Sequence, residues 1–154
     1  MDPIKSAPKQ DAFLSFRVPA TNRAERVQRG KDLRVGTPHA DLAINTPSVE
    51  RPDPIDQIEE AHVGRLDWLI GVRVARMVAS PFGFLRGSAN VMAWDVAHIP
   101  STKVTTTICG DSHIGNIGFY RSPEGAQVID VNDFDEAHTG YWEWDLRRLV
   151  ASIW

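Results

Sequence analysis

Cysteine is almost absent from this chain of 154 residues: Cys109 is the only one, which excludes an internal disulfide framework. Long apolar runs are also missing, since none approaches the roughly 20 residues that a helix needs to cross a bilayer. The N-terminal residues lack the apolar core of a secretory signal. The sequence therefore predicts no membrane span and a cytoplasmic location.

Neither sign of charge is in large excess. The chain has 20 acidic and 17 basic residues, a formal net charge of -3. Such a balance offers no global attraction to nucleic acid or to an anionic membrane, and we expect neither as a partner. A phosphate-bearing ligand would have to be held by local groups. At this length we expect one domain with a modest core and no room for two full lobes.

Proline divides the chain into two parts. Five of the ten prolines precede Ser48, and Pro52 marks the boundary. We expect residues 1–52 to form a loosely ordered lead-in with one short helix, capped by Asn22 and ended near Gly36. Residues 53–154 should form the folded domain.

Three helices are predicted in that domain. The first covers 54–79, where Asp53 can cap it and Pro54 suits its first turn. The second covers 88–98, after an aromatic turn at 80–87, and the third covers 141–154. Because the apolar positions of the third helix continue to the last residue, we expect a truncated domain that self-associates through Leu146, Leu149 and Ile153.

The segment between the last two helices reads as strands. Residues 103–109 are rich in Thr, Val and Ile, and 117–120 and 126–131 flank a turn at 122–125. The pattern predicts an α/β fold, of the α+β type, in which helices pack around a short β-hairpin and one further strand.

Polar residues stand at both ends of the predicted hairpin. Asp111 and Asn116 precede it, and Asp130 and Asp133 lie at its exit. Because a hairpin brings its ends together, we expect these four oxygen-bearing side chains to converge. A hard cation such as Mg²⁺ or Mn²⁺ would neutralise such a cluster, and Mg²⁺ is commonly shared with substrate phosphates. The pattern favours phosphate chemistry.

Each of these features also has a plainer interpretation. Asp, Asn and Gly are ordinary turn residues, so the acidic segments could be simple loops. His113 could bind a metal or orient the loop by hydrogen bonding, and we favour the second. Arg86, in the predicted aromatic turn, could clamp a phosphate or form a structural ion pair.

The motif from Gly110 to Asn116 resembles the catalytic loop of aminoglycoside phosphotransferases and related small-molecule kinases. A wider pattern is similar to the uncharacterised, mostly bacterial domain-of-unknown-function family 2252. The residues that carry this second likeness are 80–82, 86–87, 92–93, the Gly110 loop, 132–136 and 144–149. The likeness implies that residues 53–154 are part of a kinase-like catalytic domain.

The resemblance also implies roles for individual residues. Asp111 would be the catalytic base, Asn116 and Asp130 would be metal ligands, and Asp145 would brace the catalytic loop. Asp133 is a further candidate metal ligand because of its place at the hairpin exit and not because of the resemblance. The parent protein would use ATP or another nucleotide, with Mg²⁺ or Mn²⁺, to phosphorylate a hydroxyl-bearing acceptor. The glycine-rich loop and strand lysine of kinases are not visible here, so we expect them to follow the catalytic loops and the fragment alone to be inactive.

Two other functions are compatible with the motif. Asp111-Ser112-His113 is similar to the opening of metal-dependent phosphoesterases, but the further histidines that such enzymes need are missing, since only His138 follows. A non-catalytic, pseudokinase-like binding module is the third alternative.

Overall fold

The computed structural model describes residues 21–153. The described residues divide into two compact units, one ending at residue 35 and the other beginning at residue 36, which are described separately. Most of helix α2 (Arg23–Gly36) belongs to the first unit. Its start is a reciprocal cap: the Glu25 amide donates to Asn22 Oδ1 (2.9 Å), and the Asn22 amide donates to Glu25 Oε2 (3.1 Å). The predicted helix is confirmed, and it buries none of its residues. The lead-in before residue 21 lies outside the described residues.

The predicted helix over 54–79 is wrong as a single element. The structure has α3 (Pro54–Glu60) and α4 (Asp67–Val78), separated by a turn. Gly64 in this turn has φ +80°, a left-handed conformation that glycine adopts without steric cost. The predicted cap at Asp53 is present, since its side chain accepts from the Ile55 amide at 2.7 Å. Each helix buries one apolar residue, Ile58 in α3 and Met77 in α4, and the apolar spacing of the sequence runs through the turn between them.

The predicted aromatic turn is also wrong, because it is the helix α5 (Pro81–Gly87). Ser80 caps it by accepting from the Gly83 amide at 2.9 Å. Helix α6 (Ala89–Ala97) follows, as predicted, and buries Val91 and Val96. The small apolar core of this part of the unit joins α3, α4 and α6 through Ile58, Met77 and Val91.

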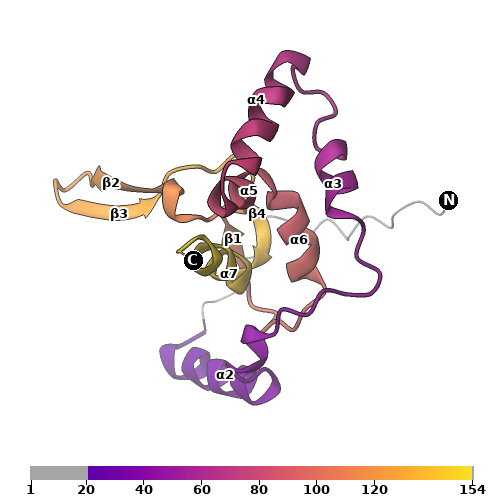
Figure 1. Cartoon of the computed structure of the whole chain (residues 1–154). Coiled ribbons are helices and arrows are strands. Elements are labelled where there is room, and N and C mark those ends of the chain that lie inside the picture. Colours follow the sequence, from indigo (N-terminus) through magenta and orange to yellow (C-terminus); the bar gives the residue numbers. More distant parts are fainter. Residues whose placement is uncertain (1–20, 154) are drawn as a thin grey trace. The chain divides into compact units, whose positions relative to one another are not determined.

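Within residues 21–153, four short strands form two antiparallel pairs. Strands β2 (Ile117–Arg121) and β3 (Gln127–Val131) make the predicted hairpin (Figure 1). In this hairpin Phe119 pairs with Ile129. Strand β1 (Thr105–Ile108) pairs with β4 (His138–Tyr141), which the sequence analysis did not identify. The described residues therefore form an α+β fold, and that prediction is confirmed.

Helix α7 (Trp142–Ile153) turns polar side chains inward. Its buried residues are Glu143, Arg148 and Ser152. Leu146 and Ile153 are exposed, at 44% and 67%. Their exposure agrees with the sequence prediction, whereas Leu149, which was also expected to be exposed, is half-buried. Self-association through this helix stays a prediction.

The part of the predicted lead-in that follows Gly36 makes specific contacts with the rest of the second unit. Arg51 forms a two-pronged ion pair with Asp95 on α6, at 2.6 and 2.7 Å. Arg147 on α7 donates to the carbonyl of Ile44 at 3.0 Å. These residues therefore belong to the folded unit. No helix within residues 21–153 is long and apolar enough to cross a membrane.

Candidate functional site

The loop that follows β1 is held by a carboxylate from α7. The amide of Cys109 donates to Asp145 Oδ2 at 2.6 Å, and the amide of Gly110 donates to Asp145 Oδ1 at 3.0 Å. Two charge-assisted hydrogen bonds from one side chain fix the backbone at the point where the loop begins. Asp145 thus lies in the position that a loop-bracing residue requires.

The same loop lies against the second acidic segment. Cys109 Sγ donates to the carbonyl of Asp133 at 2.8 Å. Burial raises the pKa of the Cys109 thiol. A hydrogen bond from the Asp111 amide lowers this pKa in part, but the nearby carboxylates of Asp145, Asp111 and Asp133 raise it further. The thiol therefore stays protonated and serves as a hydrogen-bond donor, which does not suit a nucleophile.

Gly110 allows this close approach. It has φ +84°, and a Cβ built on it would overlap the carbonyl oxygen of Glu136 and lie 2.9 Å from the Glu136 Cβ. We expect Gly110→Ala to lower the free energy of unfolding in urea by about 1–3 kcal/mol more than Gly125→Ala. Gly125 is the matched control because it has the same φ of +84° but open space around it. Equal losses of unfolding free energy in the two variants would show that Glu136 moves away from an added Cβ at no measurable cost.

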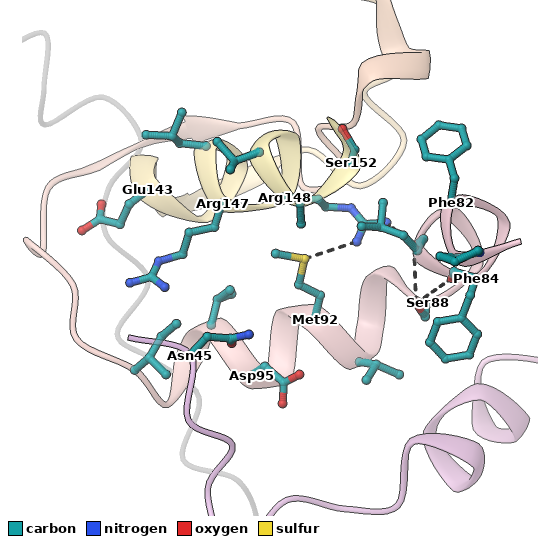
Figure 2. Close-up of a pocket in the computed structure, with 18 of the residues that line it drawn as sticks. Asn45, Phe82, Phe84, Ser88, Met92, Asp95, Glu143, Arg147, Arg148 and Ser152 are labelled. Carbon is teal, nitrogen blue, oxygen red and sulfur yellow. Dashed lines mark hydrogen bonds between the residues drawn. The ribbon is translucent and has the colours of Figure 1, made fainter. Parts of the chain in front are cut away.

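Asp111 is fixed at both its backbone and its side chain. The Asn116 amide group donates to the Asp111 carbonyl at 3.0 Å. Asp111 Oδ1 accepts a hydrogen bond from Nε of Arg148 and forms an ion pair with Nη2 of the same side chain, which is 3% exposed. Arg148 also donates to the carbonyl of Leu85 at 2.7 Å. Its Nη1 approaches Met92 Sδ at 3.5 Å, and Figure 2 shows this contact. The Leu85 carbonyl and Met92 Sδ thereby orient the Arg148 guanidinium, and the guanidinium orients the Asp111 carboxylate.

The sequence analysis missed Arg148 as a site residue. It follows Trp144 by four residues, so the two side chains share one face of the helix. An arginine on the same helix face as a tryptophan was the sequence feature that could have indicated a buried ion pair. A buried arginine needs acceptors, and Asp111 is the charged one here.

His113 lies beside the other oxygen of Asp111. Its Nε2 is 3.7 Å from Asp111 Oδ2, its ring is 1% exposed, and it meets Phe82 edge to face. Burial lowers the pKa of His113, and the nearby Arg86 and Arg148 lower it further, although Asp111 opposes them. The ring is therefore neutral near pH 7. It lies against Asp111, where it can orient the loop.

The two acidic segments converge as predicted, but their carboxylates do not form a metal cage. The Asn132 amide donates to the Asn116 carbonyl at 2.9 Å, and Asp130 pairs with Gly118 across the hairpin. Asp130 and Asp133 are exposed, and each accepts from a nearby backbone amide. Within residues 21–153 no group of three or more His, Cys, Asp or Glu side chains could hold a metal ion. Arg148 takes the neutralising role for Asp111 that the sequence analysis gave to a cation.

A cavity of about 370 Å³ lies beside Asp111. It contains Arg86, the residue singled out from the sequence, together with two arginines that were not assigned to a site. The lining residues are Arg65, Arg73, Arg86, Gly87, Ala89, Asn90, Ala93, Gly110, Asp111, Glu136 and His138. Two carboxylates, those of Asp111 and Glu136, and three guanidinium groups therefore share one small cavity.

The comparison with known protein families gives one match, over residues 65–154, to a family described as an uncharacterized protein conserved in bacteria. The chain belongs to the DUF2252 family. No curated protein and no solved structure matches it. The matched region of this DUF2252 chain runs from α4 to α7 and includes Asp111, Asp145, Arg148 and the arginines of the cavity.

A second, more apolar cavity of about 820 Å³ in the DUF2252 chain is lined in part by Arg148. Figure 2 shows Met92 and the aromatic rings of Phe82 and Phe84 among its residues. Burial lowers the pKa of Arg147, which also lines this cavity, and Glu143 opposes that shift. The cavity separates α7 from the preceding helices but does not contain Asp111.

The buried His113 predicts how the stability of this DUF2252 chain depends on pH. Its folded pKa lies below the ordinary value of 6.5, so below about pH 6.5 the unfolded chain binds a proton that the folded chain refuses. The free energy of unfolding should therefore fall as pH drops from about 6.5 toward the lowered pKa. In urea titrations at several pH values, His113→Asn should show a shallower fall than the wild type. His39→Asn, at an exposed histidine, is the control and should keep the wild-type slope.

Proposed function

We propose that this chain carries the catalytic-base side of a kinase-like phosphotransferase, which moves a nucleotide phosphate to a hydroxyl group. The observation that carries the proposal is the position of Asp111. Its backbone is held by Asn116, its loop by Asp145, and one of its oxygens by Arg148. A catalytic base needs such fixed geometry, because misplacement by about 1 Å is costly to the rate.

The reaction assigns a task to each oxygen of Asp111. Oδ1 stays with Arg148, and Oδ2 accepts the proton of the acceptor hydroxyl. The hydroxyl oxygen forms a bond to the terminal phosphorus of the nucleotide, and the bond from that phosphorus to the bridging oxygen breaks. A nucleoside diphosphate leaves with the electron pair. His113, neutral and in contact with Asp111 Oδ2, limits the directions from which the hydroxyl can approach.

A divalent ion would enter with the nucleotide phosphates. Asn116, Asp130 and Asp133 fit this shared role, because Mg²⁺ commonly takes only one or two carboxylates from the protein and fills its other positions with water and phosphate oxygens. The amide nitrogen of Asn116 is engaged with the Asp111 carbonyl, which leaves its oxygen for another partner. The ion would supply neutralisation of phosphate charge.

The test uses the intact protein, ATP and Mg²⁺ with a set of small hydroxyl compounds. We expect release of ADP that depends on the acceptor, with a new phosphate ester detected by phosphorus NMR. Free phosphate released from phosphate monoesters without ATP would instead indicate the phosphoesterase. Nucleotide binding without turnover for any acceptor would indicate the binding module.

A further inference from the structure

The arginine-lined cavity beside Asp111 has a charge pattern that the base alone does not explain. Arg65 lies just before α4, Arg73 lies within α4, and Arg86 lies in the last turn of α5. The packing of α4 against α5 thus brings three positive groups into one cavity. The acidic groups of the same cavity are Asp111 and Glu136.

Arg73 is the best-defined of the three arginines. Its Nη2 donates to the carbonyl of Gly87 at 2.5 Å, whereas its buried Nε has no hydrogen-bond partner. Burial lowers the pKa of Arg73, the nearby Arg65 lowers it further, and Glu136 opposes them. A buried guanidinium donor without an acceptor is costly, and such groups commonly mark the place of a ligand.

No described carboxylate supplies that acceptor. Among residues 21–153, the ion pairs within 4.0 Å involve Arg51, Arg148 and His113, and none of the three cavity arginines. Glu136 lines the cavity without pairing with any of them. Guanidinium groups bind phosphate and carboxylate oxygens in a two-pronged manner, and three together favour a dianion. The cavity is therefore complementary to a phosphate group.

We propose that this cavity binds a phosphate group on the acceptor, so that the substrate is a small hydroxyl compound that already carries a phosphate monoester. The inference rests on the proposed function, because it takes Asp111 as the base. Since Asp111 lines the same cavity, an acceptor anchored through its phosphate by Arg65, Arg73 and Arg86 would present a hydroxyl to Asp111 Oδ2. The product is a bisphosphate, and the nucleotide leaves as its diphosphate.

Binding is tested with inorganic phosphate on the intact protein, by calorimetry at low salt. Arg73→Gln should weaken phosphate binding at least tenfold, and Arg65→Gln, at an exposed position, provides a second variant if Arg73→Gln melts early. The matched control is Arg76→Gln, an exposed arginine of the same helix that does not line the cavity, and it should bind like the wild type. Equal affinities of the wild type, Arg73→Gln and Arg65→Gln would overturn the site.

Acceptor choice tests the assignment to the substrate. We expect glycerol 3-phosphate to stimulate ADP release with a kcat/KM at least tenfold above that of glycerol, and Arg73→Gln to remove the difference mainly through KM. Displacement of bound phosphate by ATP alone, with no preference for the phosphorylated acceptor, would overturn the acceptor assignment. Phosphate binding that depends on Arg73 in a protein without transfer activity would refute the proposed function and the acceptor role while leaving an anion site.

Discussion

Asp111→Asn is expected to lower kcat for phosphate transfer by about 10²–10⁴-fold, the usual contribution of a general base. Asparagine has nearly the same shape, and its oxygen can still accept from Arg148. Its amide cannot take a proton from the acceptor hydroxyl. The measurement is ADP release at saturating ATP and acceptor.

Asp56→Asn is the matched control, since Asp56 is an exposed carboxylate in the first turn of α3. It should keep the wild-type rate. Melting curves of both variants separate a loss of chemistry from a loss of folding. A folded Asp111→Asn variant that retains more than about a third of the wild-type kcat would exclude Asp111 as the base, because general bases contribute far more.

Arg148→Met is expected to lower the free energy of unfolding by about 3–5 kcal/mol, the range found when one partner of a buried ion pair is removed. Methionine fills much of the arginine volume. It leaves the Asp111 carboxylate, 16% exposed, without its cation and the Leu85 carbonyl without its donor. Urea denaturation measures the loss. Where Arg148→Met does not fold, Arg148→Lys keeps the charge but not the planar fork and should show an intermediate loss.

A double-mutant cycle separates the ion pair from the packing. Asp111→Asn combined with Arg148→Met should cost clearly less than the sum of the two single changes, because the double variant has no unpaired buried charge. Arg121→Met, at an exposed position on the hairpin, is the control for loss of an arginine. Additive losses at positions 111 and 148 would mean that the pair contributes no coupling energy.

The sequence indicated correctly the features whose cause is local. Asn22 and Asp53 cap helices because their side chains reach amides two or three residues ahead. The hairpin follows from strand-forming residues on both sides of a turn that contains Gly125. The break at Gly64 and the helical form of α5 were missed, since apolar spacing and glycine content do not distinguish a turn from a short helix.

For the candidate site, the sequence located the chain segments but not their pairing. It singled out Asp111 and Asn116, which are hydrogen-bonded within one loop, and Asp145, which holds the start of that loop from α7. It also expected a carboxylate cluster, whereas Arg148, 37 residues from Asp111, occupies that place. The orientation of α7 against the loop decides which of its side chains neutralises the Asp111 carboxylate. Residue types alone do not predict that orientation.

By itself the sequence determined the α+β composition of this DUF2252 chain, its caps, its hairpin and the two acidic segments that face each other across it. Only the tertiary structure decided that β4 pairs with β1, that Arg148 holds Asp111, and that Arg65, Arg73 and Arg86 meet in one cavity. The physical reason is the separation along the chain between the residues that interact. Caps and turns are set by hydrogen bonds between near neighbours, while the site depends on packing between residues that lie far apart along the chain.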